Sequence, residues 1–595
     1  MIKILHDSYF RKFLLVVLIL IFALSLRLIW LDRVPTGINN DELDHVMDAK
    51  AIFYSGKDLT GTWSPLTLKP PPHSYPKAEL PGLMISPFIG PLKISLFSAH
   101  LPFALAGTVF VLLIFLISLK LFDFNLALIA SLIAALNPAS LLFSRTGYES
   151  PLALTFYLLA FYLIIIFRGW KILLAFPFLF LAFYSYIGTK IVIVPFVLIA
   201  CFFSWWVINK KKFLKQYLIL ILLSLLLFSG FLISLQHQPS GVRTKELLSP
   251  FHPSIAHMVD EEQKTSVDSP LTRIFNNKLV VFSKLFVEKY LGIFSTSFLF
   301  LFGEGQMFFS IWKHGMFYYL DFVFLLLGFV YLFSKKRNLW LFFVALIAIA
   351  PLPSAFSLIG TEYAERAILL YFPMIIFIAA GIDYFIGLFK KKSRLFFSAS
   401  LAFLIILYAL QVLNFMTIYY LRNPIYNSEG SGFGVRILIN YVNLAKSSDR
   451  KIVVISKDNL GFFKHYLFYS GVFDREALPV IRDKIANKNF SWENIIFLSN
   501  CDSYLKVKED DVIISLAELE CFDKKEYPHW LSIPRLGDAG EIFRIYNDQV
   551  CRKYNLNPYP RGVKFTDFKV EKLTSQRFCQ KFITDLIDYS SKEIK

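Results

Sequence analysis

Charged residues are scarce in this 595-residue chain, where Asp, Glu, Lys and Arg make up 18%. A typical soluble domain has about 25%. Hydrophobic residues reach 56%, and Phe alone contributes 64 residues. A single water-soluble core could not bury so much apolar surface with so few charges to cover it. The composition excludes a purely soluble globular protein, a disordered chain and a fibrous repeat, but it allows a soluble domain attached to a membrane body.

Several common catalytic motifs are also missing. The chain has no P-loop, no GxGxxG in a βαβ context, no HExxH and no GxSxG. ATP-driven transport and metalloprotease chemistry therefore have no support in the sequence. Cysteine is rare, with five residues and no CxxC pair, which argues against a zinc site.

Basic residues outnumber acidic ones by 62 to 44, giving a formal net charge of +18. Most basic clusters lie in short gaps between apolar stretches, where the positive-inside rule places them. No basic face is interleaved with exposed aromatic residues, so we do not expect nucleic acid as a partner.

About eleven stretches are long and apolar enough to cross a bilayer. They are residues 13–31, 99–121, 124–143, 150–167, 171–187, 190–208, 213–234, 316–333, 338–357, 365–388 and 395–419. Lys3, Arg11 and Lys12 precede the first stretch, which is typical of an uncleaved signal anchor with a cytoplasmic N-terminus. The later basic gaps alternate in the same register, which places the C-terminus outside the cytoplasm.

This topology leaves two long outward segments, at about 32–99 and 236–315. From residue 425 the pattern changes to short apolar runs separated by charged stretches, at 452–456, 495–499, 512–516 and 542–546. Such runs indicate strands with helices between them. We predict an all-α polytopic membrane bundle over 1–420 and a small extracytoplasmic α/β domain over 425–595, in a multi-pass protein of the cell membrane.

Four of the five cysteines lie in this predicted domain. Four cysteines in an oxidising compartment allow two disulfides in three connectivities. We favour the pairs Cys501–Cys521 and Cys551–Cys579, and free thiols are the alternative.

Ionisable groups at the ends of membrane spans are costly, so they are candidates for function. The first such group follows the first span, with the sequence Asn39, Asn40, Asp41, Glu42, Asp44 and His45. Asn39 and Glu42 have the spacing of a helix capping box. An adjacent acidic pair could also accept a proton from a hydroxyl or hold a cation. The two interpretations are compatible, because a cap can orient a catalytic carboxylate.

Three further outward groups contain basic residues. Arg145 could pair with Glu149 as a structural clip, or it could hold a phosphate with its planar guanidinium. Arg366 could pair with Glu362 or Glu365, or it could also bind phosphate. The segment from Arg273 to residue 300 could lie on the bilayer surface or line a groove for a lipid chain.

Taken in order, these pieces resemble the GT-C superfamily of membrane glycosyltransferases, in particular the protein-mannosyltransferase and aminoarabinose-transferase-like proteins of glycosyltransferase family 39. The resemblance covers residues 10–420. It rests on residues 27–35 (RLIWLDRVP), 40–42 (NDE), 101–108 (LPFALAGT), 144–150 (SRTGYES), 184–190 (YSYIGTK), 294–300 (FSTSFLF), 353–355 (PSA), 373–381, Pro195 and Arg366. The ordered set indicates superfamily and architecture but no substrate. Residues 70–77 depart from the family's aromatic-proline segment.

The resemblance implies an inverting transfer of a sugar from a polyprenyl-phosphate donor to an acceptor hydroxyl on the outer face of the membrane. The family's catalytic base matches Asp41, with Glu42 as its neighbour. Because phosphate is a good leaving group, cationic side chains can stabilise its charge and no general acid is required. The substrate-binding candidates are Lys77, Arg145, Glu149, Lys190, Arg273 and Arg366.

The family branch that the chain resembles is described as metal-independent, so we expect no cofactor. A divalent ion held by Asp41, Glu42, Asp44 and His45 is the alternative. The expected partners are the lipid-linked donor, membrane lipids, and an acceptor that is a protein, a lipid or a surface glycan. A transporter or flippase of lipid-linked sugars is the rival function. It would need polar groups near the bilayer midplane and often shows inverted repeats.

Overall fold

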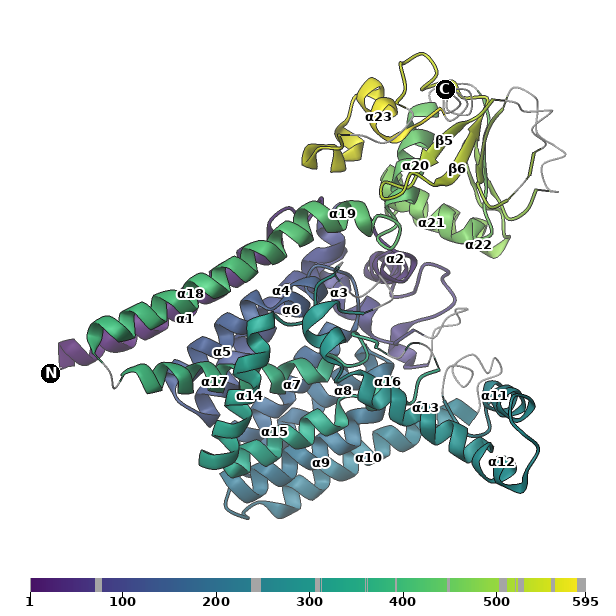
Figure 1. Ribbon diagram of the computed structural model, residues 1–595. Coiled ribbons are helices and arrows are strands. Elements are labelled where there is room, and N and C mark those ends of the chain that lie inside the picture. Colours follow the sequence, from purple (N-terminus) through teal and green to yellow (C-terminus); the bar gives the residue numbers. More distant parts are fainter. Residues whose placement is uncertain are drawn as a thin grey trace.

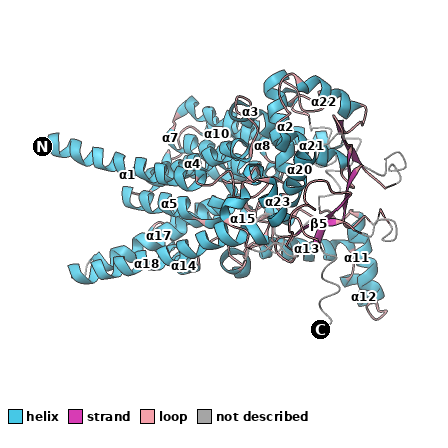
Figure 2. Ribbon diagram, turned by 90° about the horizontal axis from the view of Figure 1, so that it is seen from above, coloured by secondary structure: helices cyan, strands magenta, loops and turns pink. Residues whose placement is uncertain are grey.

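The computed structural model describes residues 2–69, 77–236, 248–304, 311, 313–358, 360, 362–390, 393–446, 450–501, 511–519, 521–522, 529–557 and 562–585. Residues 70–76, most of the stretch that departs from the family pattern, lie outside these ranges. Figure 1 shows a large helical body, with the strands gathered at the end of the molecule opposite the N-terminus. The view in Figure 2 shows the same separation.

The helices of this body run from the N-terminus to residue 426. They are α1 (Ile2–Leu28), α2 (Asn40–Ser55), α3 (Pro81–Ile89), α4 (Leu96–Leu121), α5 (Phe124–Leu136), α6 (Pro138–Phe143), α7 (Ser150–Ile166), α8 (Phe176–Ser185), α9 (Ile193–Phe203), α10 (Leu214–Gln236), α11 (Pro253–Lys264), α12 (Pro270–Phe275), α13 (Lys278–Gly292), α14 (Tyr319–Lys335), α15 (Arg337–Ile349), α16 (Leu352–Ala355), α17 (Tyr371–Lys390), α18 (Arg394–Thr417) and α19 (Asn423–Tyr426). The π-helical turn η8 (Ile418–Arg422) joins α18 to α19.

Among the residues that the structure describes, seven helical segments are long and apolar enough to cross a membrane: Tyr9–Leu28, Leu96–Leu121, Gly188–Ile208, Leu214–Ile233, Arg337–Ala355, Ile368–Lys390 and Arg394–Tyr426. Each overlaps one of the stretches predicted from the sequence. The shorter apolar helices Phe124–Leu136, Ser150–Ile166 and Gly169–Ser185 lie in three other predicted stretches. The chain is therefore mostly helical with multiple candidate spans, and the total of about eleven stays a prediction.

Glycine allows the closest helix packing in this body. A Cβ atom on Gly328 of α14 would lie 1.8 Å from the carbonyl oxygen of Phe377 in α17. A Cβ on Gly381 of α17 would lie 2.0 Å from the carbonyl oxygen of Phe324 in α14. Any larger residue would push the two helices apart, so small residues set this contact, as is common between helices in membranes.

The C-terminal region, which we define as residues 433–585, contains α20 (Phe433–Ala445), α21 (Asn459–Ser470), α22 (Ala477–Ala486), α23 (Ser575–Phe582) and a sheet. The strands are β1 (Ile452–Ile455), β2 (Ser491–Trp492), β3 (Ile495–Leu498), β4 (Val512–Leu516), β5 (Leu531–Pro534) and β6 (Glu541–Tyr546), in the order β2-β3-β1-β4-β6-β5. β1 is parallel to β3 and β4, and the other pairs are antiparallel.

The four strands expected from the sequence correspond to β1, β3, β4 and β6, whereas β2 and β5 were not anticipated. All four residues of β1 are buried, as expected for a central strand that is covered on both faces. Both predicted disulfides, Cys501–Cys521 and Cys551–Cys579, are present. The remaining cysteine, Cys201, is buried in α9.

Candidate functional site

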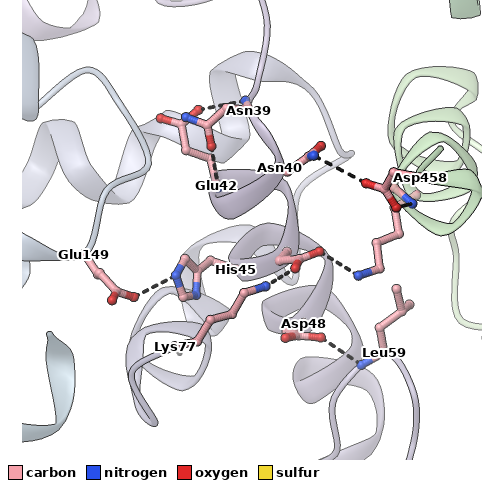
Figure 3. Close-up of polar contacts among 12 residues, drawn as sticks. Asn39, Asn40, Glu42, His45, Asp48, Leu59, Lys77, Glu149 and Asp458 are labelled. Atoms are coloured by element: carbon pink, nitrogen blue, oxygen red, sulfur yellow. Dashed lines mark hydrogen bonds and ion pairs between the residues drawn. The ribbon is translucent and has the colours of Figure 1, made fainter. Parts of the chain in front are cut away.

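The capping box predicted at the start of α2 is present. The Asn39 side chain accepts a hydrogen bond from the Glu42 N–H at 2.9 Å, and Glu42 Oε2 accepts one from the Asn39 N–H at 3.3 Å. Glu42 Oε1 accepts a third bond, from the N–H of Gly147, at 2.5 Å. Figure 3 shows the two contacts between Asn39 and Glu42. Both carboxylate oxygens of buried Glu42 therefore accept hydrogen bonds from backbone N–H groups, and the bond from Gly147 ties α2 to the loop between α6 and α7.

Asp41 differs from its neighbour, because it is exposed in the first turn of α2. Its negative charge acts on His45, Lys77, Tyr148, Tyr363 and Glu365. These residues come from α2, from the loops before α3 and α7, and from the segment before α17. Asp41 therefore lies close enough to these four segments for its charge to act on them, and it lies at the positive end of the α2 dipole.

His45 and Glu149 form an ion pair beside Asp41, with 2.7 Å between His45 Nε2 and Glu149 Oε2 (Figure 3). Both side chains are buried. Burial alone would lower the pKa of His45, but the charge of Glu149 and its hydrogen bond outweigh that effect, and the pKa of His45 is raised. Glu149 thus pairs with His45 rather than forming the clip with Arg145 that the sequence suggested.

The Asp44 carboxylate is shared by two lysines. Lys77 pairs with Oδ2, and Lys464 of α21 pairs with Oδ1 at 2.7 Å. Burial and the nearby charge of Lys464 lower the pKa of Lys77 to about 7. The C-terminal region therefore contributes a charged residue to the cluster. The sequence analysis missed Lys464, because no local motif marks it.

Arg145 is fully buried and bonded mainly to the backbone. Nη1 donates to the carbonyl oxygens of Leu26 (3.0 Å) and Arg27 (2.8 Å). Nη2 donates to the carbonyl oxygen of Val34 (2.8 Å), and Nε donates to the hydroxyl of Tyr419 (3.1 Å). This pattern joins the end of α1 to η8 and to the loop before α7. A role in phosphate binding stays a prediction.

Arg366 lies next to a group of carboxyl side chains. Its guanidinium is 4.5 Å from the centroid of the Tyr363 ring, and its charge acts on Glu304 and Glu365. Glu365 precedes the span that begins at Ile368, and burial together with the charge of Glu149 raises its pKa to about 8. Burial likewise raises the pKa of Glu304 to about 8. Near neutral pH these two carboxyls are largely protonated and can donate hydrogen bonds.

Two other predicted residues lie in different surroundings. Lys190 is buried, and its ammonium donates to both carboxylate oxygens of Glu79, at 2.9 and 2.7 Å. The charge of this lysine is therefore balanced by a buried carboxylate. Arg273 belongs to α12, its side chain is 79% exposed, and it lies 4.0 Å from Asp268. In both ribbon views α12 is at the periphery, away from α2 (Figures 1 and 2). The site thus brings together Asp41, Glu42, Lys77 and Glu149, with Arg366 near them.

A small cavity of about 30 Å³ lies beside the α2 cap. Its lining includes Asn39, Glu42 and Tyr148, together with Asn423 of α19 and Asn427 directly after α19. A volume of this size accommodates a water molecule or two, so it is too small for a sugar.

The side chains proposed as metal ligands interact with other groups of the protein. Glu42 accepts from two backbone N–H groups, Asp44 pairs with two lysines, and His45 pairs with Glu149. Within the described ranges, no group of three or more His, Cys, Asp or Glu side chains is arranged to hold a metal ion. The residues therefore do not fit the alternative of a divalent ion at Asp41, Glu42, Asp44 and His45.

No family model matches the chain, and no curated protein matches it. Among solved structures, the chain is similar to an oligosaccharyltransferase, AglB of Archaeoglobus fulgidus, in complex with an inhibitory peptide and a dolichol-phosphate. That match has a TM-score of 0.43 and 13% identity, and it covers 91% of this chain and 75% of the other.

The chain is also similar to ArnT of Cupriavidus metallidurans bound to undecaprenyl phosphate, with a TM-score of 0.47 and 12% identity over 90% of this chain and 98% of the other. At this identity and with TM-scores below 0.5, the similarity decides neither the activity nor the substrates of this chain.

Proposed function

We propose that this protein is an integral-membrane glycosyltransferase. It moves a sugar from a polyprenyl-phosphate donor to an acceptor hydroxyl on the outer face of the membrane, with inversion at the anomeric carbon. The observation that carries the proposal is the placement of Asp41, an exposed carboxylate at the start of α2, whose charge acts on Lys77 and on His45, the partner of Glu149.

Asp41 acts as the general base. The acceptor hydroxyl must lose its proton as its oxygen bonds to the anomeric carbon, and a carboxylate within hydrogen-bond reach can accept that proton. Glu42 is less suited to the same step, because both of its oxygens already accept backbone hydrogen bonds. Its role is to hold the turn that presents Asp41.

Lys77 and Arg366 stabilise the departing lipid phosphate. Cations held in a partly water-excluded site stabilise developing negative charge more strongly than cations in water. Lys77 is buried, and its partner is a side-chain carboxylate that a second lysine shares. A phosphate can replace such a partner, whereas the four hydrogen bonds of Arg145 are made mainly to fixed backbone carbonyls.

The donor's lipid tail explains the need for a membrane body. We place the N-terminus of α1 in the cytoplasm, and α2 and the C-terminal region on the outer side, following the distribution of basic residues. The acceptor is a protein, a lipid or a surface glycan.

A transfer assay in nanodiscs tests the proposal. Wild type, Asp41→Asn and the control Asp268→Asn receive a panel of radiolabelled polyprenyl-phosphate sugars and a membrane extract as acceptor. Asp268 is a matched control, because its side chain is 92% exposed on the distant outward segment. We expect label transfer by wild type and Asp268→Asn, and a loss of about 100-fold or more in Asp41→Asn while donor binding persists.

Transfer that survives in Asp41→Asn would remove Asp41 as the base and leave the segment as a helix cap. If wild type transfers no sugar from any donor in the panel, the proposal that the protein is a transferase using one of these donors fails. A lipid flipping assay on the same nanodisc preparation reconstituted in vesicles would then test the flippase alternative.

A further inference from the structure

The C-terminal region contacts the chain directly before Asp41. Arg436 Nη1 donates to the carbonyl oxygen of Thr36 at 2.5 Å, and the Tyr469 hydroxyl accepts a hydrogen bond from the Ile38 N–H at 3.2 Å. A Cβ atom on Gly37 would lie 2.4 Å from the carbonyl oxygen of Ser431, in the link between α19 and the C-terminal region, so the two backbones approach as closely as glycine permits. The segment that leads into α2 is therefore held from the C-terminal side.

Helix α21 contacts the first turns of α2 as well. His465 Nε2 lies 3.0 Å from Asn40 Oδ1, and Asn40 Nδ2 donates to Asp458 Oδ2 at 3.5 Å (Figure 3). One turn further along α2, Lys464 donates to Asp44 Oδ1 at 2.7 Å. Asn40 and Asp44 flank the exposed Asp41, so α21 positions the part of α2 that carries it.

The Asp44 pairing involves two cations and one carboxylate. Lys77, Lys464 and Asp44 have side chains that are 6%, 12% and 19% exposed, so water screens the cluster only weakly. Because each lysine takes a different carboxylate oxygen, Asp44 compensates only one of the two positive charges. If Lys464 were absent, Asp44 could offer both oxygens to Lys77 and hold it more tightly.

We infer that Lys464 of the C-terminal region is a positioning residue for Lys77: by sharing Asp44, it weakens the hold of Asp44 on Lys77, so that the Lys77 ammonium can exchange this carboxylate for the phosphate of the lipid-linked donor. The inference rests on the proposed function, in which Lys77 binds that phosphate. It assigns the C-terminal region a direct part in donor binding, through a residue 420 positions away from Asp44 in the chain.

The charges around Lys77 agree with this role. Asp41 and Asp44 of α2, Glu149 before α7 and Lys464 of α21 act on the Lys77 ammonium. Burial and the positive charge of Lys464 lower the pKa of Lys77 to about 7, against the raising effect of Asp41 and Glu149. Removing the charge of Lys464 must therefore raise the pKa of Lys77. A change that only loosens the contact between the C-terminal region and α2 would instead remove burial and Lys464 together.

The test uses the full-length protein in nanodiscs and compares wild type with Lys464→Met, Lys464→Arg and Lys457→Met. Lys464→Arg keeps a cation on Asp44. Lys457 is the matched control, because it is a 69% exposed lysine of the same region and lies 3.8 Å from Glu518. The first readout is the rate of Lys77 acylation by an amine reagent as a function of pH, measured by peptide mass spectrometry, which needs no turnover. The second is the affinity for farnesyl phosphate at pH 6.

In Lys464→Met we expect the midpoint of Lys77 acylation to move to higher pH by about one unit, and the affinity for farnesyl phosphate at pH 6 to fall several-fold. Lys464→Arg and Lys457→Met should behave as wild type in both. Asp44→Asn combined with Lys464→Met should recover the lost affinity, because the carboxylate that holds Lys77 is then absent.

An unchanged acylation midpoint in folded Lys464→Met would overturn the inference, whatever the transfer assay shows. If Lys464→Met does not fold, Lys464→Gln and the Asp44→Asn variant provide the same comparison. A wild type that neither binds farnesyl phosphate nor transfers sugar would refute the proposed donor, and with it the link from Lys464 to donor binding. Normal transfer together with unchanged affinity in Lys464→Met would refute the inference alone.

Discussion

Two buried cations of the helical body, Arg145 and Lys77, are held in different ways. Arg145 donates to three backbone carbonyls and one tyrosine hydroxyl. Lys77 pairs with the side chain of Asp44, which Lys464 also engages. A backbone carbonyl cannot turn away without disturbing its helix, whereas a carboxylate can rotate. Burial alone therefore does not distinguish a structural cation from one that can exchange its partner for a substrate.

We expect the largest effect on stability from the substitution of Arg145. In Arg145→Met the carbonyl oxygens of Leu26 and Arg27 at the end of α1 and of Val34 in the following loop lose a donor, and each unsatisfied buried polar group costs about 1–3 kcal/mol. We expect a loss of at least about 3 kcal/mol in the free energy of unfolding, measured by thermal or denaturant unfolding in detergent. A folded, fully stable Arg145→Met would contradict the structural assignment and revive the phosphate-binding role.

Lys77→Met should show the opposite behaviour. Removing one member of a buried ion pair is costly when it leaves an uncompensated charge, but in this variant Asp44 keeps Lys464 as its partner. We expect the free energy of unfolding to change by about 1 kcal/mol or less, while the rate of sugar transfer falls about 100-fold. Equal losses of stability and activity in this variant would mean that Lys77 is as structural as Arg145.

The pH dependence of transfer should follow Lys77 and not Arg145. Lys77 has its pKa lowered to about 7. The cationic form of Lys77 binds phosphate, so kcat/KM should be highest below pH 7 and should fall up to tenfold per pH unit above pH 7. Measuring kcat/KM between pH 6 and 9 checks this. A profile that stays flat to pH 9 argues that no group with a lowered pKa controls the reaction.

The smallest effect is expected at Glu42. Glu42→Gln keeps the shape of the side chain, and its remaining carbonyl oxygen can still accept a backbone hydrogen bond. Loss of a capping interaction typically costs about 1 kcal/mol. We expect a decrease of that size in unfolding free energy and a change of less than tenfold in transfer rate, measured beside Asp41→Asn. If Glu42→Gln were as inactive as Asp41→Asn, Glu42 would share the chemistry.

Local patterns predicted the features that neighbouring residues determine. The seven candidate spans overlap the predicted apolar stretches, and β1, β3, β4 and β6 lie at the expected apolar runs. The capping box of Asn39 and Glu42 is visible in the spacing of four residues. In contrast, β5 (Leu531–Pro534) contains four buried residues but is short and carries no alternating pattern, so it was not anticipated.

The candidate site was predicted only in part. Asp41, Glu42, Lys77 and Glu149 lie near one another in the structure, and their roles stay predictions. The partners of these residues were not predictable: Glu149 pairs with His45, and Arg145 bonds to carbonyls more than 100 positions away. The raised pKa values of Glu304 and Glu365 also depend on burial, which no local motif encodes.

The sequence by itself determined a helical chain with multiple apolar spans, a C-terminal α/β segment and an acidic turn after the first span, whereas the structure decided the pairing of the four C-terminal cysteines. Hydropathy, periodicity and cap spacing are properties of residues close together in the chain. Only the tertiary structure decided that Asp41 is exposed while Glu42 is a buried anchor, that Arg145 donates to three backbone carbonyls, and that Lys464 shares Asp44 with Lys77. Burial and charge pairing arise when distant segments pack together, and that packing separates a structural ion from an exchangeable one.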